Sequence, residues 1–278
     1  MKIGYKHMRI GNREFDTRHH TYVMGILNIT PDSFSDGGKW MDREDALRHA
    51  RQMIEDGADI IDIGGESTRP GYTQVGAEEE MERVLPVIER LRTEFDIPIS
   101  LDTCKSTVAE AGIRAGVDLI NDIWGLKYDE KMAEVIAAGE AACCLMHNRK
   151  EAKYDRLLPD VLTDLAETVK IAEKAGIARE NIMLDPGIGF GKTYEQNLQL
   201  LHYMEELHCF GYPLLLGTSR KSVIGLTLDL PPQERLEGTL VTTALAVEKH
   251  YSFVRVHDVK ENVRAIKMAE ALRDCAGD

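Results

Sequence analysis

Eight short apolar runs recur along this chain, and segments with helical spacing of apolar residues separate them. Each run has the length of a β-strand and is almost continuously apolar, as is typical of parallel strands covered on both faces. The runs are Val23–Leu27, Ala58–Ile63, Ile97–Leu101, Val117–Ile120, Ala141–Met146, Asn181–Leu184, Pro213–Leu216 and Phe253–Val256. Eight strand–helix units within about 250 residues favour a closed (β/α)₈ TIM barrel over an open doubly wound sheet. The expected fold class is therefore α/β.

The segments between these runs place apolar residues three and four positions apart, so that they share one helical face. Such faces are formed by Ala46, Leu47, Ala50, Met53 and Ile54, by Met81, Val84, Leu85, Ile88 and Leu91, by Val161, Leu165, Val169 and Ala172, and by Leu236, Leu240, Thr243, Ala244 and Val247. Asp42 is predicted to be a helix N-cap. The expected C-terminal caps, each just before the next strand, are Gly57, Gly116, Gly139 and Gly176.

The first 21 residues differ from the rest. From Met1 to Thr21 polar and apolar residues alternate around a turn at Gly11-Asn12, which predicts a short β-hairpin. No linker rich in Pro, Ser or Gly divides the chain, and 43% hydrophobic content suffices for one barrel-sized core. We expect one domain over residues 1–278, with residues 1–21 as an N-terminal hairpin extension.

Composition restricts the partners and the compartment. A formal net charge of −13 argues against nucleic acid or a membrane surface as partner, although a basic pocket for an anionic substrate remains compatible with it. No apolar run approaches the roughly 18 residues of a membrane span, and the N-terminus lacks the apolar core of a signal peptide. Five cysteines without CxxC spacing fit reduced thiols and a cytoplasmic location. Cys143 and Cys144 are expected to fill the core.

Polar residues follow most of the expected strands. In a barrel, residues just past the strands converge on one mouth, where buried polarity is unfavourable unless a ligand or internal pairing satisfies it. These residues are Asn28, Gly64–Gly71, Asp102, Asn121, Met146-His147, Asp185, Gly217–Ser222 and Arg255–Asp258. They predict a binding site.

The chemistry of this site divides in two. Four residues could line a floor that accepts hydrogen bonds from a planar heterocycle, and a carboxylate facing two N–H donors contributes about 1.5–3 kcal/mol per bond. They are Asp102, Asn121, Asp185 and Lys221. Phe190 could stack on such a ring or fill the core, with equal weight. Asn28, Arg255 and His257 instead carry the right donors for phosphate oxygens.

Several familiar motifs are excluded. Gly187–Thr193 looks like a phosphate loop, but Pro186 stands where a Walker A pattern needs glycine, and the spacing is not G-x-G-x-x-G. The sequence has no G-x-S-x-G elbow, and its nine histidines show no zinc spacing.

Five stretches, in order, resemble the motifs of the bacterial dihydropteroate synthase family of pterin-binding barrels. They are Gly25–Gly38 (GILNITPDSFSDGG), Gly64–Gly71 (GGESTRPG), Asp185–Lys192 (DPGIGFGK), Ser219–Ser222 (SRKS) and Arg255–Asp258 (RVHD). The first is highly specific, whereas each of the others would be weak alone. The likeness runs from about Thr21 to the last helix. The tract Asn148–Lys153 departs from it, since it lacks the glycine-bearing loop of the family.

The resemblance implies a (β/α)₈ barrel that condenses 6-hydroxymethyl-7,8-dihydropterin pyrophosphate with p-aminobenzoate. The products would be 7,8-dihydropteroate and pyrophosphate, in folate biosynthesis, with sulfonamides competing for the p-aminobenzoate place. It also implies a transferase that uses Mg²⁺ and forms a homodimer through outer helices.

Residue roles carry over by motif. The resemblance assigns the pterin to Asp102, Asn121, Met146, Asp185, Phe190 and Lys221. It assigns the pyrophosphate to Asn28, Thr68, Arg69, Arg255 and His257, with Mg²⁺ at Asn28. It assigns p-aminobenzoate to Phe34, Pro70, Lys221 and Ser222, and mobile loops to Asp36 and Ser67. The expected catalytic set is Asp102, Asp185, Lys221, Arg255 and His257.

Charge favours a dissociative mechanism for such a reaction. Breaking the bond between the methylene carbon and the pyrophosphate oxygen leaves negative charge on one side and positive charge in the pterin ring, and fixed groups of opposite sign lie at each end. A neutral aromatic amine needs no strong base. Two alternatives remain: a methyltetrahydrofolate corrinoid methyltransferase, which has no use for a pyrophosphate site, and a non-catalytic pterin-binding barrel, which would be expected to lose the charged floor residues first.

Overall fold

Eight parallel strands form the centre of the protein. The computed structural model describes residues 7–29, 39–66 and 75–275. The strands are β3 (Tyr22–Asn28), β4 (Ile60–Gly64), β5 (Ile99–Asp102), β6 (Leu119–Asp122), β7 (Ala142–Met146), β8 (Ile182–Asp185), β9 (Leu215–Leu216) and β10 (Phe253–Val256). Their order is β8-β7-β6-β5-β4-β3-β10-β9. A parallel bridge between Leu184 and Leu214 joins the two ends, so the predicted barrel is confirmed.

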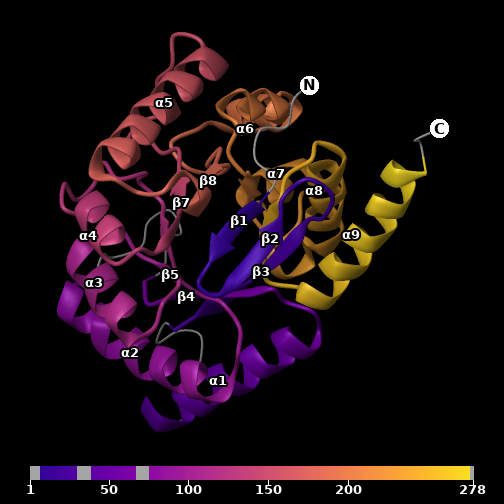
Figure 1. Cartoon of the computed structure of the whole chain (residues 1–278). Coiled ribbons are helices and arrows are strands. Elements are labelled where there is room, and N and C mark those ends of the chain that lie inside the picture. The colour runs from indigo at the N-terminus through magenta and orange to yellow at the C-terminus, as the bar shows by residue number, and fades with distance from the viewer. Residues whose placement is uncertain (1–6, 30–38, 67–74, 276–278) are drawn as a thin grey trace.

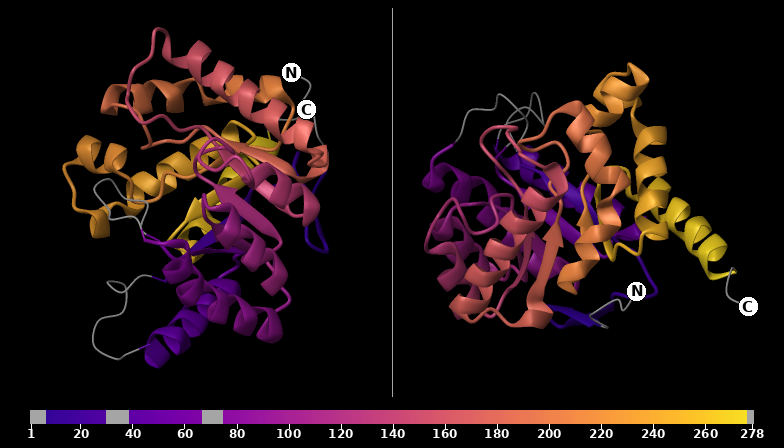
Figure 2. Two further views of the ribbon diagram at one scale, coloured as in Figure 1. Left: turned by 90° about the vertical axis from the view of Figure 1, so that its left-hand side faces the viewer. Right: turned by 90° about the horizontal axis from the view of Figure 1, so that it is seen from above.

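Helices surround the strands and follow one another round the ring in chain order (Figures 1 and 2). They are α1 (Lys39–Glu55), α2 (Ala77–Glu94), α3 (Ser106–Ala115), α4 (Met132–Ala138), α5 (Leu157–Ala175), α6 (Tyr194–His202), α7 (Ser222–Leu228), α8 (Leu236–Glu248) and α9 (Val259–Asp274). Short 3-10 turns are η2 (Arg179–Asn181), η3 (Met204–Phe210) and η4 (Pro232–Glu234). Together they cover the outer face of the barrel.

The predicted helix ends are mostly right. Gly116 and Gly176 cap α3 and α5 in the left-handed conformation, with φ of 105° and 86°, where glycine avoids the Cβ clash. Gly139 also caps its helix, but at a right-handed φ of −85°. The N-cap prediction for Asp42 is wrong, because α1 begins at Lys39 and Asp42 lies in its first turn.

The predicted hairpin is present and closes one end of the barrel. Strands β1 (His7–Ile10) and β2 (Arg13–Asp16) pair antiparallel around the two-residue turn. Phe15 packs with its ring 4.8 Å from that of Tyr22 and 5.6 Å from that of Phe253, the first residues of β3 and β10. The hairpin therefore lies against the N-terminal ends of the strands, and in Figure 1 it crosses the centre of the ring of helices.

The interior of the barrel is apolar near the N-terminal ends of the strands and polar near their C-terminal ends. Alternate residues of a strand face the same side. The first inward-facing residues of several strands form one buried apolar cluster with the hairpin: Met24, Ile60, Leu119, Met183 and Phe253. The residues two positions further along the same strands are Ile26, Asp62, Asn121, Asp185 and Arg255. A polar layer thus lies directly above the apolar one, towards the C-terminal mouth.

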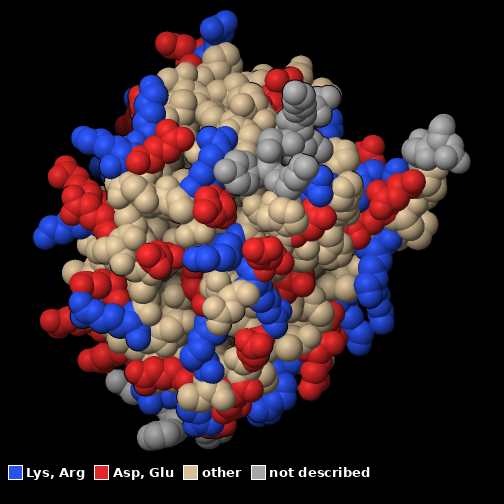
Figure 3. Space-filling view, in the orientation of Figure 1, with Lys and Arg blue, Asp and Glu red and all other residues tan. Residues whose placement is uncertain are grey.

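A second and larger apolar cluster fills the space between strands and helices. Cys143 belongs to it and Cys144 to the inner cluster, and both are fully buried, which confirms the prediction that they fill the core. None of the helices in the described segments is long and apolar enough to cross a bilayer. Basic and acidic side chains are interspersed over the face seen in Figure 3.

Candidate active site

Three charged side chains form the centre of the polar layer. The guanidinium of Arg255 donates from Nε to Asp62 Oδ2 at 2.6 Å and from Nη2 to Asp102 Oδ2 at 2.7 Å. Asp62 is completely buried, Asp102 is 7% exposed, and the Arg255 side chain is 17% exposed. Because a buried charge that loses its partner typically destabilises a protein by about 3–5 kcal/mol, the three groups depend on one another.

Asp62 is a site residue that the sequence pattern concealed. Besides Arg255, it accepts hydrogen bonds from Ser100 Oγ at 2.5 Å and from Asn121 Nδ2 at 3.4 Å. It lies inside β4, and its run was predicted only as a buried strand. The signal was an acid two residues after Ile60 within that run, because period-two alternation puts both side chains on one face.

Burial alters the protonation of the floor acids. It raises the pKa of Asp102 to about 7, against the opposing charge of Arg255 and with a further rise from the negative charge of Asp62. Burial also raises the pKa of Asp185, while the Lys221 ammonium and the Gly187 N–H, 2.7 Å from Asp185 Oδ1, pull it back. The protonation of Asp102 and of Asp185 therefore depends on the charge of a bound ligand.

Asp185, Lys221 and Arg255 converge on the backbone of Gly217. A Cβ atom placed on this glycine would lie 3.5 Å from Asp185 Oδ2, 3.7 Å from Lys221 Nζ and 3.9 Å from Arg255 Cβ. An acid and a cation predicted for the floor thus lie beside one glycine, next to the strand residue that carries the predicted anion-binding guanidinium. The absence of a side chain at position 217 leaves room for about one methyl group there.

Lys221 is held by the loop that follows β8. Its Nζ donates to the Ile188 carbonyl at 2.6 Å and lies 4.6 Å from the centre of the Phe190 ring. Burial lowers the pKa of Lys221 to about 8, and the nearby Asp185 carboxylate limits the fall. Phe190 is half-buried and belongs to neither apolar cluster, which favours the stacking alternative over the core-filling one.

The rim of the mouth carries the predicted anion-binding groups. His257 follows β10, and its Nδ1 lies 3.0 Å from Ser219 Oγ. Asn28 ends β3 and faces Gly64, since a Cβ there would be 3.5 Å from Asn28 Oδ1 and 3.8 Å from Asp102 Cβ. Ser222 is exposed as the first residue of α7. Met146 ends β7 and pairs in register with Asp185.

The fit of Mg²⁺ depends on Asn28. The described segments contain no group of three or more His, Cys, Asp or Glu side chains that could hold a metal ion. Mg²⁺ usually keeps several waters and binds few protein oxygens together with substrate phosphates, so one amide oxygen at the rim is compatible with it. Six predicted site residues lie outside the described residues: Phe34, Asp36, Ser67, Thr68, Arg69 and Pro70.

The comparisons with known proteins agree with this geometry. Residues 24–257 match the family model described as pterin binding enzyme. The chain is 57% identical to a dihydropteroate synthase of Clostridium beijerinckii, covering 95% of this chain and 99% of the relative. It is 56% identical to that of Bacillus subtilis, covering 94% and 91%.

Solved structures give the same result. A Clostridium difficile dihydropteroate synthase in the presence of pteroic acid superposes with a TM-score of 0.91 at 50% identity, covering 93% of this chain and 98% of that one. A Xanthomonas albilineans dihydropteroate synthase with 4-aminobenzoic acid superposes with a TM-score of 0.91 at 40% identity, covering 96% and 98%.

Proposed function

Because the chain belongs to the pterin-binding enzyme family, and within it to the dihydropteroate synthases, we propose that the mouth of its barrel joins 6-hydroxymethyl-7,8-dihydropterin pyrophosphate to p-aminobenzoate. The products are 7,8-dihydropteroate and pyrophosphate. The observation that carries this proposal is the convergence of Asp185, Lys221 and Arg255 on Gly217. Structures of relatives with pteroic acid and with 4-aminobenzoic acid support the choice of substrates.

The floor binds the pterin. The Asp185 carboxylate accepts hydrogen bonds from adjacent ring N–H groups, each contributing about 1.5–3 kcal/mol. Asn121 and Asp102 extend the polar floor from the neighbouring strands β6 and β5. Met146 and Phe190 pack against the ring faces. Burial of both acids favours a ligand that brings its own N–H donors, because such donors replace the water that the floor excludes.

The rim holds the pyrophosphate. Two nitrogens of Arg255 are bonded to Asp62 and Asp102, so its remaining Nη1 is the group directed at the leaving oxygens. His257, oriented by Ser219, donates a second hydrogen bond. The family resemblance adds Thr68 and Arg69, which lie outside the described residues. Mg²⁺ held by Asn28 would supply positive charge at the phosphate oxygens.

Fixed charges at both ends of the breaking bond favour dissociation. The methylene carbon–oxygen bond breaks heterolytically, and its electron pair leaves with pyrophosphate, where the Arg255 cation stabilises it. The positive charge that remains spreads into the pterin ring, against Asp102 and Asp185. The neutral amine of p-aminobenzoate then attacks the methylene carbon with its lone pair, and the proton of the resulting ammonium passes to water. Fixed groups of this kind can each contribute about 3–4 kcal/mol to transition-state stabilisation.

p-Aminobenzoate lies nearest the solvent. Its carboxylate faces the first backbone N–H groups of α7, beginning at Ser222. Lys221 precedes this helix. The family resemblance adds Phe34 and Pro70, which lie outside the described residues. A sulfonamide of similar shape would compete for this place.

One assay separates the candidate functions. The protein is incubated with the pterin pyrophosphate, Mg²⁺ and p-aminobenzoate, and both pyrophosphate and dihydropteroate are measured. Formation of equal amounts of the two products supports the proposal. Methyl transfer from methyltetrahydrofolate to a corrinoid protein would support the methyltransferase alternative, and pterin binding without any product would support the non-catalytic barrel.

We also propose a cytoplasmic homodimer. All five cysteines are free thiols, which suits a reducing compartment. The outer helices α7 and α8 expose Leu226 at 65% and Val241 at 69%. A homodimer interface usually buries such apolar side chains. Light scattering at micromolar concentration tests the dimer, and a monomer mass would contradict it.

A further inference from the structure

Lys192 is a half-buried cation that the proposed chemistry does not use. Lys192 is the last residue of the loop that starts at Asp185, and its side chain folds back onto the backbone of that loop. Its Nζ lies 2.8 Å from the Gly187 carbonyl oxygen, 3.0 Å from the Phe190 carbonyl oxygen and 2.9 Å from His147 Nδ1. An ammonium group has three donors and no acceptor, so these three acceptors satisfy its charged form completely.

The loop above Lys192 supplies the contacts of two floor residues. The Gly187 N–H donates to Asp185 Oδ1, and the Ile188 carbonyl accepts from Lys221 Nζ. The ring of Phe190 lies beside the same Lys221 ammonium. Lys192 binds the carbonyls of Gly187 and Phe190, at both ends of this set of contacts. Any shift of the loop would therefore move Asp185 and Lys221 together.

The loop also fits tightly against the segment that follows β7. Gly187 has a φ of 71°, and a Cβ on it would lie 1.9 Å from the His147 carbonyl oxygen. The His147 N–H donates to the Asp185 carbonyl at 2.9 Å. His147 is thus joined to the loop both through its backbone and through Lys192.

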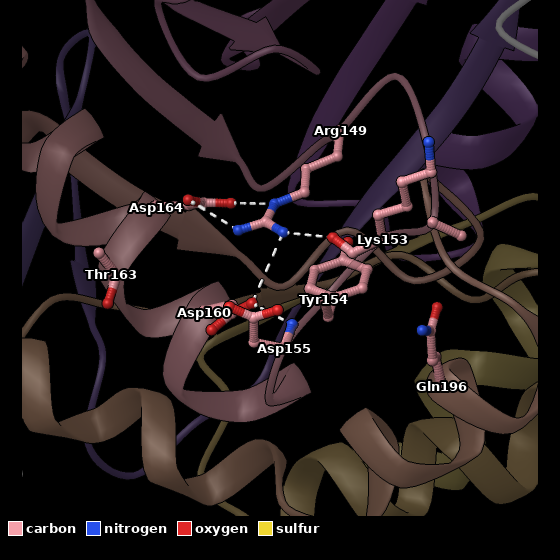
Figure 4. Close-up of a pocket in the computed structure, with 9 residues that line it drawn as sticks. Arg149, Lys153, Tyr154, Asp155, Asp160, Thr163, Asp164 and Gln196 are labelled. Atoms are coloured by element: carbon pink, nitrogen blue, oxygen red, sulfur yellow. Dashed lines mark hydrogen bonds and ion pairs between the residues drawn. The ribbon is translucent and has the colours of Figure 1, made fainter.

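The charge on Lys192 sets the tautomer of neutral His147. A lysine ammonium has only donors, so in that form Nδ1 of His147 accepts, and Nε2 carries the proton that it donates to Asp164 Oδ2 at 3.0 Å. Burial lowers the pKa of Lys192 to about 7, against the opposing charge of Asp185, so the ammonium form prevails below that pH. Burial lowers the pKa of His147 to about 4, against the opposing hydrogen bond to Asp164. Arg149 holds Asp164 with bonds of 2.6 and 3.2 Å, at the edge of a pocket of about 760 Å³ (Figure 4).

We propose that Lys192 is a positioning residue for pterin binding: its ammonium, held by neutral His147, fixes the loop that aligns Asp185 and Lys221 with the heterocycle. The inference rests on the proposed function, because it assumes that the floor binds a pterin. It assigns to Lys192 a larger effect on the pterin, which both Asp185 and Lys221 bind, than on p-aminobenzoate, which shares only Lys221 with it.

The test compares Lys192→Met with Lys170→Met, a change at an exposed lysine of α5. Calorimetric titration with 6-hydroxymethylpterin should show at least about tenfold weaker binding for Lys192→Met and unchanged binding for Lys170→Met, since tenfold corresponds to about 1.4 kcal/mol. The KM for p-aminobenzoate should rise by a smaller factor, because of the two aligned residues only Lys221 belongs to its site. Equal losses for both substrates, or no loss of pterin binding, would overturn the inference.

The pH dependence of binding separates positioning from simple destabilisation. The groups that face Lys192 are His147 and Arg149 after β7, Asp164 on α5, Asp185 on β8 and Lys221 before α7. Of these, Asp185 is the acid that binds the pterin, and loss of a neighbouring cation makes it protonate at higher pH. The acidic limit of 6-hydroxymethylpterin binding should therefore move to higher pH in Lys192→Met. An unchanged limit would contradict the inference.

His147 variants keep the test decisive if Lys192→Met does not fold. His147→Asn retains an acceptor for Lys192, whereas His147→Leu does not, so Asn should preserve pterin affinity better than Leu. Equal affinities would overturn the inference. A wild-type chain that binds 6-hydroxymethylpterin without forming dihydropteroate would refute the proposed function alone. A wild-type chain that does not bind it would refute both.

Discussion

Arg255 and Asp62 meet in the centre of the barrel, where the guanidinium Nε lies 2.6 Å from the Asp62 Oδ2. The acid comes from β4 and the base from β10, and β3 separates these two strands in the sheet. Their bond fixes the angle of the arginine, because Nη2 is simultaneously directed at Asp102 on β5. The arginine thus reaches the rim only in the orientation that the two acids allow.

Asp62→Asn should therefore lower turnover, although the Asp62 side chain itself does not contact the substrate. The amide keeps the shape but removes the charge that orients Arg255, and we expect kcat/KM to fall by about 10- to 100-fold, or about 1.4–2.8 kcal/mol. Far-UV circular dichroism should remain that of the wild type. Asp155→Asn, at an exposed position, is the matched control. Activity within twofold of the control would contradict the role of Asp62.

Asp185→Asn should abolish pterin binding and turnover together. An asparagine has one acceptor oxygen where the carboxylate has two, and it presents N–H donors to the donors of the ring. We expect the affinity for 6-hydroxymethylpterin to fall at least about tenfold. Isothermal titration checks the affinity, and an unchanged value would remove Asp185 from the pterin floor.

Arg255→Ala should weaken the pyrophosphate-bearing ligand more than free 6-hydroxymethylpterin. The change also leaves Asp62 and Asp102 without their cation, so the free energy of unfolding should fall by about 3–5 kcal/mol. Both ligands must therefore be titrated on protein shown to be folded at the temperature used. Equal losses for the two ligands would argue against the anion-site assignment.

Gly217→Ala tests whether ligand occupies the space between Asp185 and Lys221. The added methyl would make ordinary van der Waals contacts of 3.5 and 3.7 Å with these side chains, so the thermal unfolding midpoint should change little. Pterin affinity should fall, because the methyl takes room at the convergence point. Unimpaired binding would place the heterocycle elsewhere.

Asp102 should give the protein a distinctive pH dependence. Burial, opposed by Arg255, leaves its folded pKa at about 7, above the ordinary value of 3.8. The folded state then holds a proton that the unfolded state has released, so stability should fall as pH rises from about 4 to about 7. In Asp102→Asn the free energy of unfolding should fall less over the same pH range. Denaturant titrations of both proteins at several pH values measure it, and parallel curves would contradict it.

The fold could be predicted from the sequence because its strands are apolar on both faces and its helices on one. The polar residues just past the strands, such as Asn28 and Asp185, were visible for the same reason, since each interrupts an apolar run. Asp62 was concealed within such a run, and its partners come from β5, β6 and β10. Register across three strands decides that contact, and no local pattern contains it.

Lys192 illustrates a different limit. Its sequence neighbours suggested a phosphate loop, and the failed motif left the lysine without a role. Its three acceptors include His147, which lies 45 residues away in the chain. Only the close packing of the glycine-containing loop after β8 against the backbone of His147 and Arg149 brings them together, and propensity rules do not describe such packing.

The hairpin covers the N-terminal end of the barrel and leaves the C-terminal mouth as the open end. Met8, Ile10 and Phe15 fill the opposite end with buried apolar side chains, so the described residues leave the C-terminal mouth as the route to the polar layer. If the deepest groups receive the pterin, a molecule of p-aminobenzoate seated first would obstruct its path. Substrate binding is then ordered: the pterin enters before p-aminobenzoate, and the joined product leaves through the same mouth.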